Sequence, residues 1–360
     1  MSATNRQELW RQYIEAGFVS GEIPAAGEVR SPWPVRVMLG VAGWIGAIFL
    51  LGFAGAVYAA IFRSAQAAIP AGILCCAAAF AVFKGLPHNE FLEQFAFAVS
   101  LAGQSMLMVG WFQLVGAQRG GSAVPFLLMA VVEFALAFAV PNYLHRVFTA
   151  VAANVCLFIA AVILGAAGVA TGVAAVCTVL LWIDPVRLAR RPSLWEPIAY
   201  GFAIALLHMD GSLLLGSDLW RVFTPYGAKA LAHTAWFGPA AEGLVFIYAA
   251  WVLRARARVR HDSAAGIAII AASLLTACFG IAAPGIVAAI LVMVLAFSNS
   301  NRVLMGLGLI AFAGYLSHFY YQLHFTLLVK SGLLFAAGVV LLLMRFALGK
   351  FFPAGESQDA

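Results

Sequence analysis

Histidine, tyrosine and lysine side chains interrupt the apolar sequence near the C-terminus, in the stretch from Gly314 to Ser331. Aspartate, glutamate and a further histidine interrupt two earlier apolar runs. Imidazole, carboxyl, phenol and ammonium groups can relay protons, bind ions or pair with one another, and in lipid they mark function or a specific pairing. These residues form a candidate functional cluster, which comprises His208, Asp210, Glu242, His318, Tyr320, Tyr321, His324 and Lys330.

Lys330 is the costliest member of this cluster, because it lies about 8 Å into an apolar run at ~1.5 Å rise per helical residue. Its four-carbon stem can carry the ammonium group outward to water. It can also pair with Glu242 or Asp210, or contact a substrate, a lipid headgroup or a partner protein. Tyr320 and Tyr321 also fit an interfacial aromatic belt. The residues alone leave these alternatives open.

An intramembrane acid, Glu133, lies near the middle of another apolar run, and Gln104 lies in the run before it. Burial disfavours the charged form of a carboxyl group, so Glu133 must face the interior of a bundle or hold a proton. One interpretation is a structural hydrogen bond with Gln104. The other is a role in proton or ion movement.

The cluster lacks the spacing of a metal site, because His208 and Asp210 are two residues apart and diverge on a helix. We therefore expect no bound metal and no cofactor. The chain has no Gly-rich phosphate loop, no His-Glu-x-x-His and no Gly-x-Ser-x-Gly motif, so no catalytic residue is assigned. The five cysteines lie in apolar stretches and are interpreted as small packing residues.

Apolar helices must position these residues. Hydrophobic residues make up 64% of the chain and charged residues 10%, against roughly 45–50% and about 25% in soluble domains. The expected fold class is therefore an all-α integral membrane bundle, solvated largely by lipid. Twelve apolar runs approach the ~20 residues that span a bilayer, and they cover residues 35–62, 66–83, 92–115, 123–140, 146–164, 167–183, 195–214, 237–253, 263–281, 283–298, 303–321 and 325–347.

The predicted organisation has three parts. An amphipathic segment at 1–34 lies on the inner membrane face or docks on the protein, a polytopic domain covers 35–347, and a tail covers 348–360. A longer loop at about 212–236 lies on the external side. The connections near 165–168 and 282–284 are short enough to be either turns between spans or breaks in re-entrant segments. The 34 glycines favour close helix packing.

Basic residues predict the orientation. With the N-terminus inside, 16 of the 21 lysines and arginines fall on the cytoplasmic side, 4 fall outside, and Lys330 falls within a span. Both termini are therefore predicted to be cytoplasmic. The same clustering accounts for the net charge of +6, and we expect no nucleic-acid partner.

A cysteine introduced at Ala228 should react with a membrane-impermeant thiol reagent in intact cells, whereas one at Ala257 should react only after permeabilisation. The reason is that the two positions fall on opposite sides of the predicted topology. The reverse pattern of labelling would invert the orientation and separate the residues grouped by depth.

A pattern of glycine, tyrosine, histidine, lysine and leucine residues closes the apolar domain. It comprises Gly314-Tyr315, Tyr320-Tyr321-Gln-Leu-His324, Thr326-Leu-Leu, Lys330-Ser331, Gly338 and Leu341-Leu342 with Arg345. The pattern resembles the end of an uncharacterised family of bacterial multi-pass membrane proteins, known as a domain of unknown function. The resemblance implies a bacterial inner-membrane location. It also implies a membrane partner, since the family is often encoded beside a small protein with a Gly-Asp-Tyr motif, but it implies no activity.

Three functions are compatible with the sequence. The number of spans and the intramembrane charges favour transport or permeation of a small solute or a lipid-linked molecule, with Glu133 and the cluster as coupling or binding groups. An alternative is a non-catalytic scaffold for a small membrane or periplasmic partner protein. A third is a membrane enzyme that acts on a lipid-borne substrate, with His318 or His324 as general base. The lipid bilayer is a partner in all three.

Overall fold

The computed structural model describes residues 33–53, 64–86, 89–116, 122–214 and 236–322, together with Arg11, Ile14, Glu15, Ser331, Val339 and Leu342. These residues form twelve α-helices and no strand. The helices are α2 (Trp33–Phe53), α4 (Ala65–Gly85), α5 (Glu90–Leu114), α6 (Val124–Ala139), α7 (Tyr143–Ile163), α8 (Ala167–Trp182), α9 (Pro185–Arg190), α10 (Pro192–Leu214), α13 (Phe237–Arg256), α14 (Ala264–Ala282), α15 (Ile286–Ser298) and α16 (Arg302–Gln322).

Six of these helices are long and apolar enough to cross a membrane, namely α4, α5, α7, α10, α14 and α16. Shorter apolar helical stretches lie in α2, α6, α8 and α15. The all-helical class is confirmed, and the apolar helices support a membrane-embedded protein. The count of twelve spans and the cytoplasmic termini stay predictions. Nearly all of the last expected span, residues 54–62 of the first, most of the amphipathic segment, the tail and most of the external loop lie outside the described residues.

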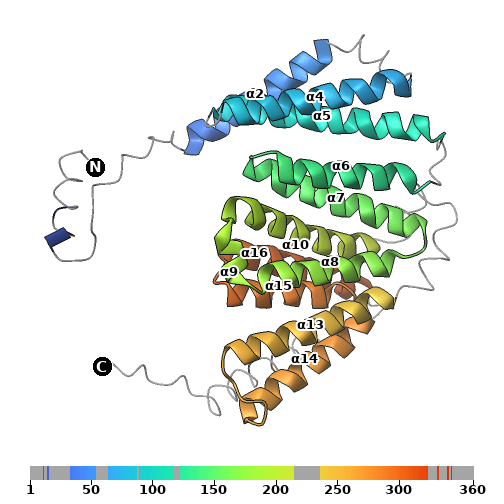
Figure 1. Cartoon of the computed structure of the whole chain (residues 1–360). Helices are drawn as coiled ribbons and strands as arrows, with labels where there is room; N and C mark the ends of the chain where they lie inside the picture. Colours follow the sequence, from blue (N-terminus) through green and yellow to red (C-terminus); the bar gives the residue numbers. More distant parts are fainter. Residues whose placement is uncertain are drawn as a thin grey trace.

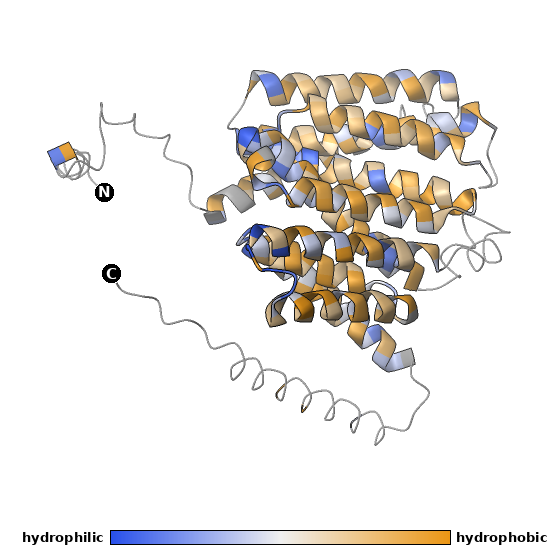
Figure 2. Ribbon diagram, turned by 60° about the horizontal axis from the view of Figure 1, so that its bottom comes forward, coloured by the Kyte–Doolittle hydropathy of each residue, from blue (hydrophilic) through white to orange (hydrophobic). Residues whose placement is uncertain are grey.

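The helices lie side by side in a stack (Figure 1). The helices α2, α4 and α5 form one edge, α6 and α7 follow, and α13 and α14 form the opposite edge. The largest buried core lies between them, where α8, α10, α15 and α16 meet around fully buried side chains such as Leu206, Leu291 and Leu295. Hydrophobic residues cover most of the ribbon and many hydrophilic residues gather near helix ends (Figure 2), as expected for helices that face lipid.

Polar contacts hold one end of the stack together. Arg146 donates from Nη1 to the carbonyl of Ser193 at 2.6 Å, and Asn299 donates to the carbonyl of Trp182 at 2.9 Å. These contacts join the start of α7 to the start of α10, and the end of α15 to the end of α8. The basic residues near these helix ends therefore share one end of the molecule, called the basic end below: Arg146, Arg187, Arg190, Arg191, Arg254, Arg256, Arg258, Arg260 and Arg302.

Glycines allow α4 and α5 to approach closely, as the sequence predicts. A Cβ atom added at Gly72 would lie 2.7 Å from the carbonyl oxygen of Gly103, and one added at Gly103 would lie 2.8 Å from that of Gly72. Backbones this close gain dispersion contacts, which drive helix association in lipid. All five cysteines are free. Cys76 and Cys156 are buried, as expected of packing residues, whereas Cys278 is exposed.

Both short connections are turns between helices, each with a glycine at positive φ: Gly165 (+73°) and Gly285 (+85°). The helices that follow are short, with 16 residues in α8 and 13 in α15, against the ~20 of a full span. A Cβ at Gly285 would lie 3.2 Å from the ring of Tyr315, which precedes the end of α16 by about two turns. The start of α15 is therefore recessed by roughly 10 Å from that end of α16.

Candidate functional site

Two carboxyl groups meet beside this recessed turn. Asp210 of α10 is 3% exposed and Glu242 of α13 is 1% exposed, and their side chains interact with each other. Helical spacing explains their burial. Asp210 follows the fully buried Leu206 by four residues, and Glu242 precedes the buried Phe246 by four, so each carboxyl continues an inward face. We call these two residues the carboxyl pair.

The helices α8 and α16 complete the surroundings of the carboxyl pair. Thr171 of α8 lies beside Glu242 and donates from its hydroxyl to the carbonyl of Gly168 at 3.2 Å. Tyr315 of α16 is 7% exposed and donates from its hydroxyl to the carbonyl of Leu207 at 2.5 Å. These two hydroxyls are polar groups close to the pair.

Glycine allows α13 to bring Glu242 to this position. A Cβ added at Gly238 would lie 2.5 Å from the hydroxyl oxygen of Thr171, and 3.3 Å from the backbone of Gly168. A larger residue there would push α13 away from α8, and Glu242 away from Asp210. The close approach of these helices is therefore a condition of the site.

The carboxyl pair is poorly satisfied by the described residues. Oδ2 of Asp210 and both carboxyl oxygens of Glu242 make no hydrogen bond of normal geometry. No described lysine, arginine or histidine forms an ion pair with either group, while Lys330 lies outside the described residues. Two buried carboxyl groups in contact cannot both ionise at a moderate cost, so without a cation such a pair retains a proton.

The structure describes four further members of the predicted cluster, His208, His318, Tyr320 and Tyr321. His208 is exposed while Asp210 is buried, as their spacing on a helix predicts. His318 packs edge to face on Phe319, with ring centroids 5.8 Å apart. Tyr320 packs on Tyr321, which is 76% exposed. His324 and Lys330 fall outside the described residues. No group of three His, Cys, Asp or Glu residues with metal-binding geometry occurs in the described part of the chain.

Glu133 of α6 lies in a second buried region, beside residues of α4 and α7. It is 2% exposed, and its Oε2 atom has no hydrogen-bond partner within the described ranges. Its electrostatic neighbours are the thiols of Cys76 and Cys156. The expected bond from Gln104 to Glu133 is not formed between these two described side chains, because Gln104 donates instead to the hydroxyl of Ser100 at 3.2 Å.

The Ser100 hydroxyl also pairs with Nε2 of His145 at 2.9 Å. His145 is fully buried, and the rings of Phe83 and Phe97 pack edge to face on it at 5.4 and 5.8 Å between centroids. Its Nδ1 atom has no partner among the described residues. The Ser100–His145 bond therefore joins α5 to α7 within the buried core.

Replacing Ser100 by alanine should lower the free energy of unfolding by about 1–3 kcal/mol, because the buried polar atoms of Gln104 and His145 would both lose a partner. Ser105→Ala is the matched control on the same helix. Ser105 is exposed and bonds only to the carbonyl of Leu101, at 2.9 Å, so its loss should cost within about 0.5 kcal/mol. Thermal unfolding in detergent measures both. Equal melting temperatures would show that the Ser100 contacts contribute nothing.

Comparison with known proteins gives one finding. A family model described as Domain of unknown function (DUF4401) matches residues 32–351. No curated protein and no solved structure matches the chain. The match confirms the resemblance to an uncharacterised family and covers nearly all the helices described above.

Proposed function

The chain belongs to the family known as Domain of unknown function (DUF4401), and because that description names no activity, we propose a function from the geometry of the chain itself. The proposed function is that of a proton-coupled membrane permease for a small solute or a lipid-linked molecule. In this proposal the carboxyl pair binds and releases the coupled proton. Glu133 is a second protonatable group, deeper in the helix layers.

The observation that carries the proposal is the burial of Asp210 and Glu242 against each other with no described basic partner. Burying a polar group without full hydrogen bonding costs free energy, and burying its charge costs more. A purely structural role would be served at lower cost by apolar side chains of similar size. A scaffold or a lipid-facing enzyme has no evident need for such a pair, whereas proton-coupled transport needs a buried group that can change protonation.

The recessed turn supports the same proposal. In many transporters, binding sites lie where helices are interrupted within the membrane and their free ends face the site. Here α15 begins at Gly285, beside Tyr315 and the carboxyl pair, and the short α8 carries Thr171 to the same place. The positive end of a helix dipole near the pair favours its ionised form, which would assist release of the proton.

We also propose that the basic end faces the cytoplasm of a bacterial inner membrane, in keeping with the positive-inside rule. The carboxyl pair then lies in the external third of the bilayer. Labelling of cysteines at Ala228 and Ala257 tests this orientation.

The function is tested in proteoliposomes that contain a pH-sensitive dye. Solutes are added singly from a panel of amino acids, sugars, nucleosides and organic acids, and the internal pH is followed. We expect a solute-dependent pH change with the wild type that is lost in Asp210→Asn and Glu242→Gln. A variant with both substitutions that moves protons like the wild type would refute coupling through the pair.

A further inference from the structure

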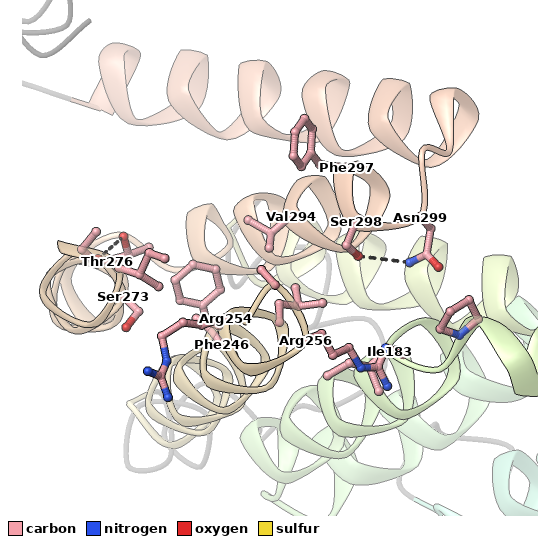
Figure 3. Close-up of a pocket in the computed structure, with 16 residues that line it drawn as sticks. Ile183, Phe246, Arg254, Arg256, Ser273, Thr276, Val294, Phe297, Ser298 and Asn299 are labelled. Carbon is pink, nitrogen blue, oxygen red and sulfur yellow. Dashed lines mark hydrogen bonds between the residues drawn. The ribbon is translucent and has the colours of Figure 1, made fainter. Parts of the chain in front are cut away.

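A cavity of about 660 Å³ lies between α13, α14 and α15, near the basic end (Figure 3). Most of its wall is apolar, as with Phe246 and Val294, and two arginines, Arg254 and Arg256, lie at its border. We propose that this cavity binds an anionic phospholipid, with acyl chain on the apolar wall and phosphate beside Arg254. It is called the lipid cavity below. The inference is independent of the proposed transport.

The exposed apolar residues around the mouth of the cavity indicate that its occupant comes from the bilayer. Phe297 lines the cavity and is 80% exposed, and Ala272, also on the wall, is exposed as well. The surface of α14 beside it carries large exposed apolar side chains, including Leu275 at 71%. Such a surface lies against lipid in a membrane protein, so the mouth of the cavity opens sideways toward acyl chains. The volume is within the ~300–1,000 Å³ of ordinary ligand sites.

The two arginines differ in how many of their hydrogen-bond donors are already used within the protein. Arg256 donates from Nη1 to the carbonyl of Ile183 and so joins the end of α13 to the end of α8. Arg254 donates from Nη1 to the carbonyl of Val259 at 3.2 Å, while its Nε atom is buried and has no hydrogen bond to a described residue. Arg254 therefore retains donors for a ligand. A guanidinium group matches the geometry of phosphate oxygens.

Charge selects the class of headgroup. The lining holds two arginines and no acidic residue. The hydroxyls of Ser273 and Thr276 donate to carbonyls of their own helix, each at 2.8 Å. An anionic headgroup such as that of phosphatidylglycerol brings only complementary charge to this border. A zwitterionic headgroup would bring a cation close to the arginines with no acid in the lining to receive it.

The test uses the full chain purified in detergent and exchanged into nanodiscs that contain phosphatidylglycerol or phosphatidylcholine, with bound lipid counted by native mass spectrometry. The wild type should retain phosphatidylglycerol over phosphatidylcholine. Arg254→Gln should reduce that retention about tenfold, as expected for loss of a charge-assisted hydrogen bond. Ala250→Phe, which fills the cavity wall, should reduce it similarly. Arg302→Gln is the control, an exposed arginine at the same end and outside the lining, and should retain lipid as the wild type does.

A photoreactive benzoylphenylalanine at Thr276 identifies the occupant directly. A covalent adduct with the mass of phosphatidylglycerol is expected. Cross-links to a peptide from residues 325–347, or to a second copy of the chain, would overturn the proposal by naming another occupant. Equal lipid retention in Arg254→Gln, Arg302→Gln and the wild type would also overturn it. Arg254→Gln keeps its polar character and so decides the question even where Ala250→Phe fails to fold.

Discussion

The thermal stability of the wild type should fall as the pH rises, and the variant with both Asp210→Asn and Glu242→Gln should show a smaller fall. An ordinary carboxyl group in the unfolded chain is ionised above about pH 5. In the proposed function, the native carboxyl pair, buried and without a described basic partner, holds at least one proton in that range. The native state then binds more protons than the unfolded state, so the free energy of unfolding falls as the pH rises.

The expected magnitude follows from linkage. Each proton that the native state holds and the unfolded state does not hold lowers stability by about 1.4 kcal/mol per pH unit. Between about pH 5 and the pH at which the native pair ionises, the wild type should therefore lose stability at up to this slope through the pair. The amide variant has no proton to hold at these positions, and its stability should be higher than that of the wild type at the alkaline end of the range.

Melting temperatures in detergent at a series of pH values measure this difference. Glu196→Gln is a matched control, since Glu196 is a half-buried acid at the opposite end of the same helix, α10. This variant leaves both carboxyl groups of the pair in place, so it should keep the fall in stability that the pair causes. An amide variant that melts below the wild type at every pH would contradict the prediction. Such a result would indicate that Lys330 completes an ion pair with the carboxyl groups and loses its partner in the variant.

That Asp210 and Glu242 lie at a similar depth could be predicted from the sequence, because depth in the membrane is a one-dimensional property. Their contact with each other was not predicted, since the sequence suggested Lys330 as the partner of one or the other. Once the apolar runs are ordered, Asp210 near the end of one run and Glu242 near the start of the next fall on the same side of the predicted bilayer. Their cost in lipid then requires that they face the interior. The same reasoning grouped His208 with them, yet depth alone says nothing about which side of a helix faces the core. Here the spacing of two residues decided the matter, and it leaves His208 exposed.

The rest of the site depends on contacts between different helices, which the periodicity of apolar residues in the sequence does not predict. Thr171 and Tyr315 lie in different helices from the carboxyl pair, and neither is costly enough in lipid to demand a partner. The same holds for Ser100 and His145, whose bond joins α5 to α7. A signal for Ser100 did exist, because it precedes Gln104 by four residues and so shares its helix face. The recessed turn could only be suspected from the short connection, since its depth depends on how α15 packs against α16.

Gly285→Ala should destabilise the fold and loosen the carboxyl pair. Gly285 has a φ of +85°, a region that costs other residues roughly 1–2 kcal/mol. The new Cβ would also lie 3.2–3.3 Å from three ring atoms of Tyr315, which is itself buried. We expect a total cost of about 2–4 kcal/mol, with the larger part from the close contact. A displaced ring would also break the bond from the Tyr315 hydroxyl to the carbonyl of Leu207.

Two comparisons isolate the cause. Gly306→Ala is the matched control in α16, because a Cβ there would meet no atom within 4 Å, and the change should be neutral or stabilising by up to about 1 kcal/mol. Tyr315→Phe removes the hydroxyl alone and should cost about 1 kcal/mol. If Gly285→Ala melts at the temperature of Gly306→Ala, the turn is not held against Tyr315. If it costs no more than Tyr315→Phe, the hydroxyl bond rather than the backbone is what matters. If Gly285→Ala is the least stable of the three variants, as expected, the recessed turn and the Tyr315 ring together cover the carboxyl pair and separate it from the membrane surface.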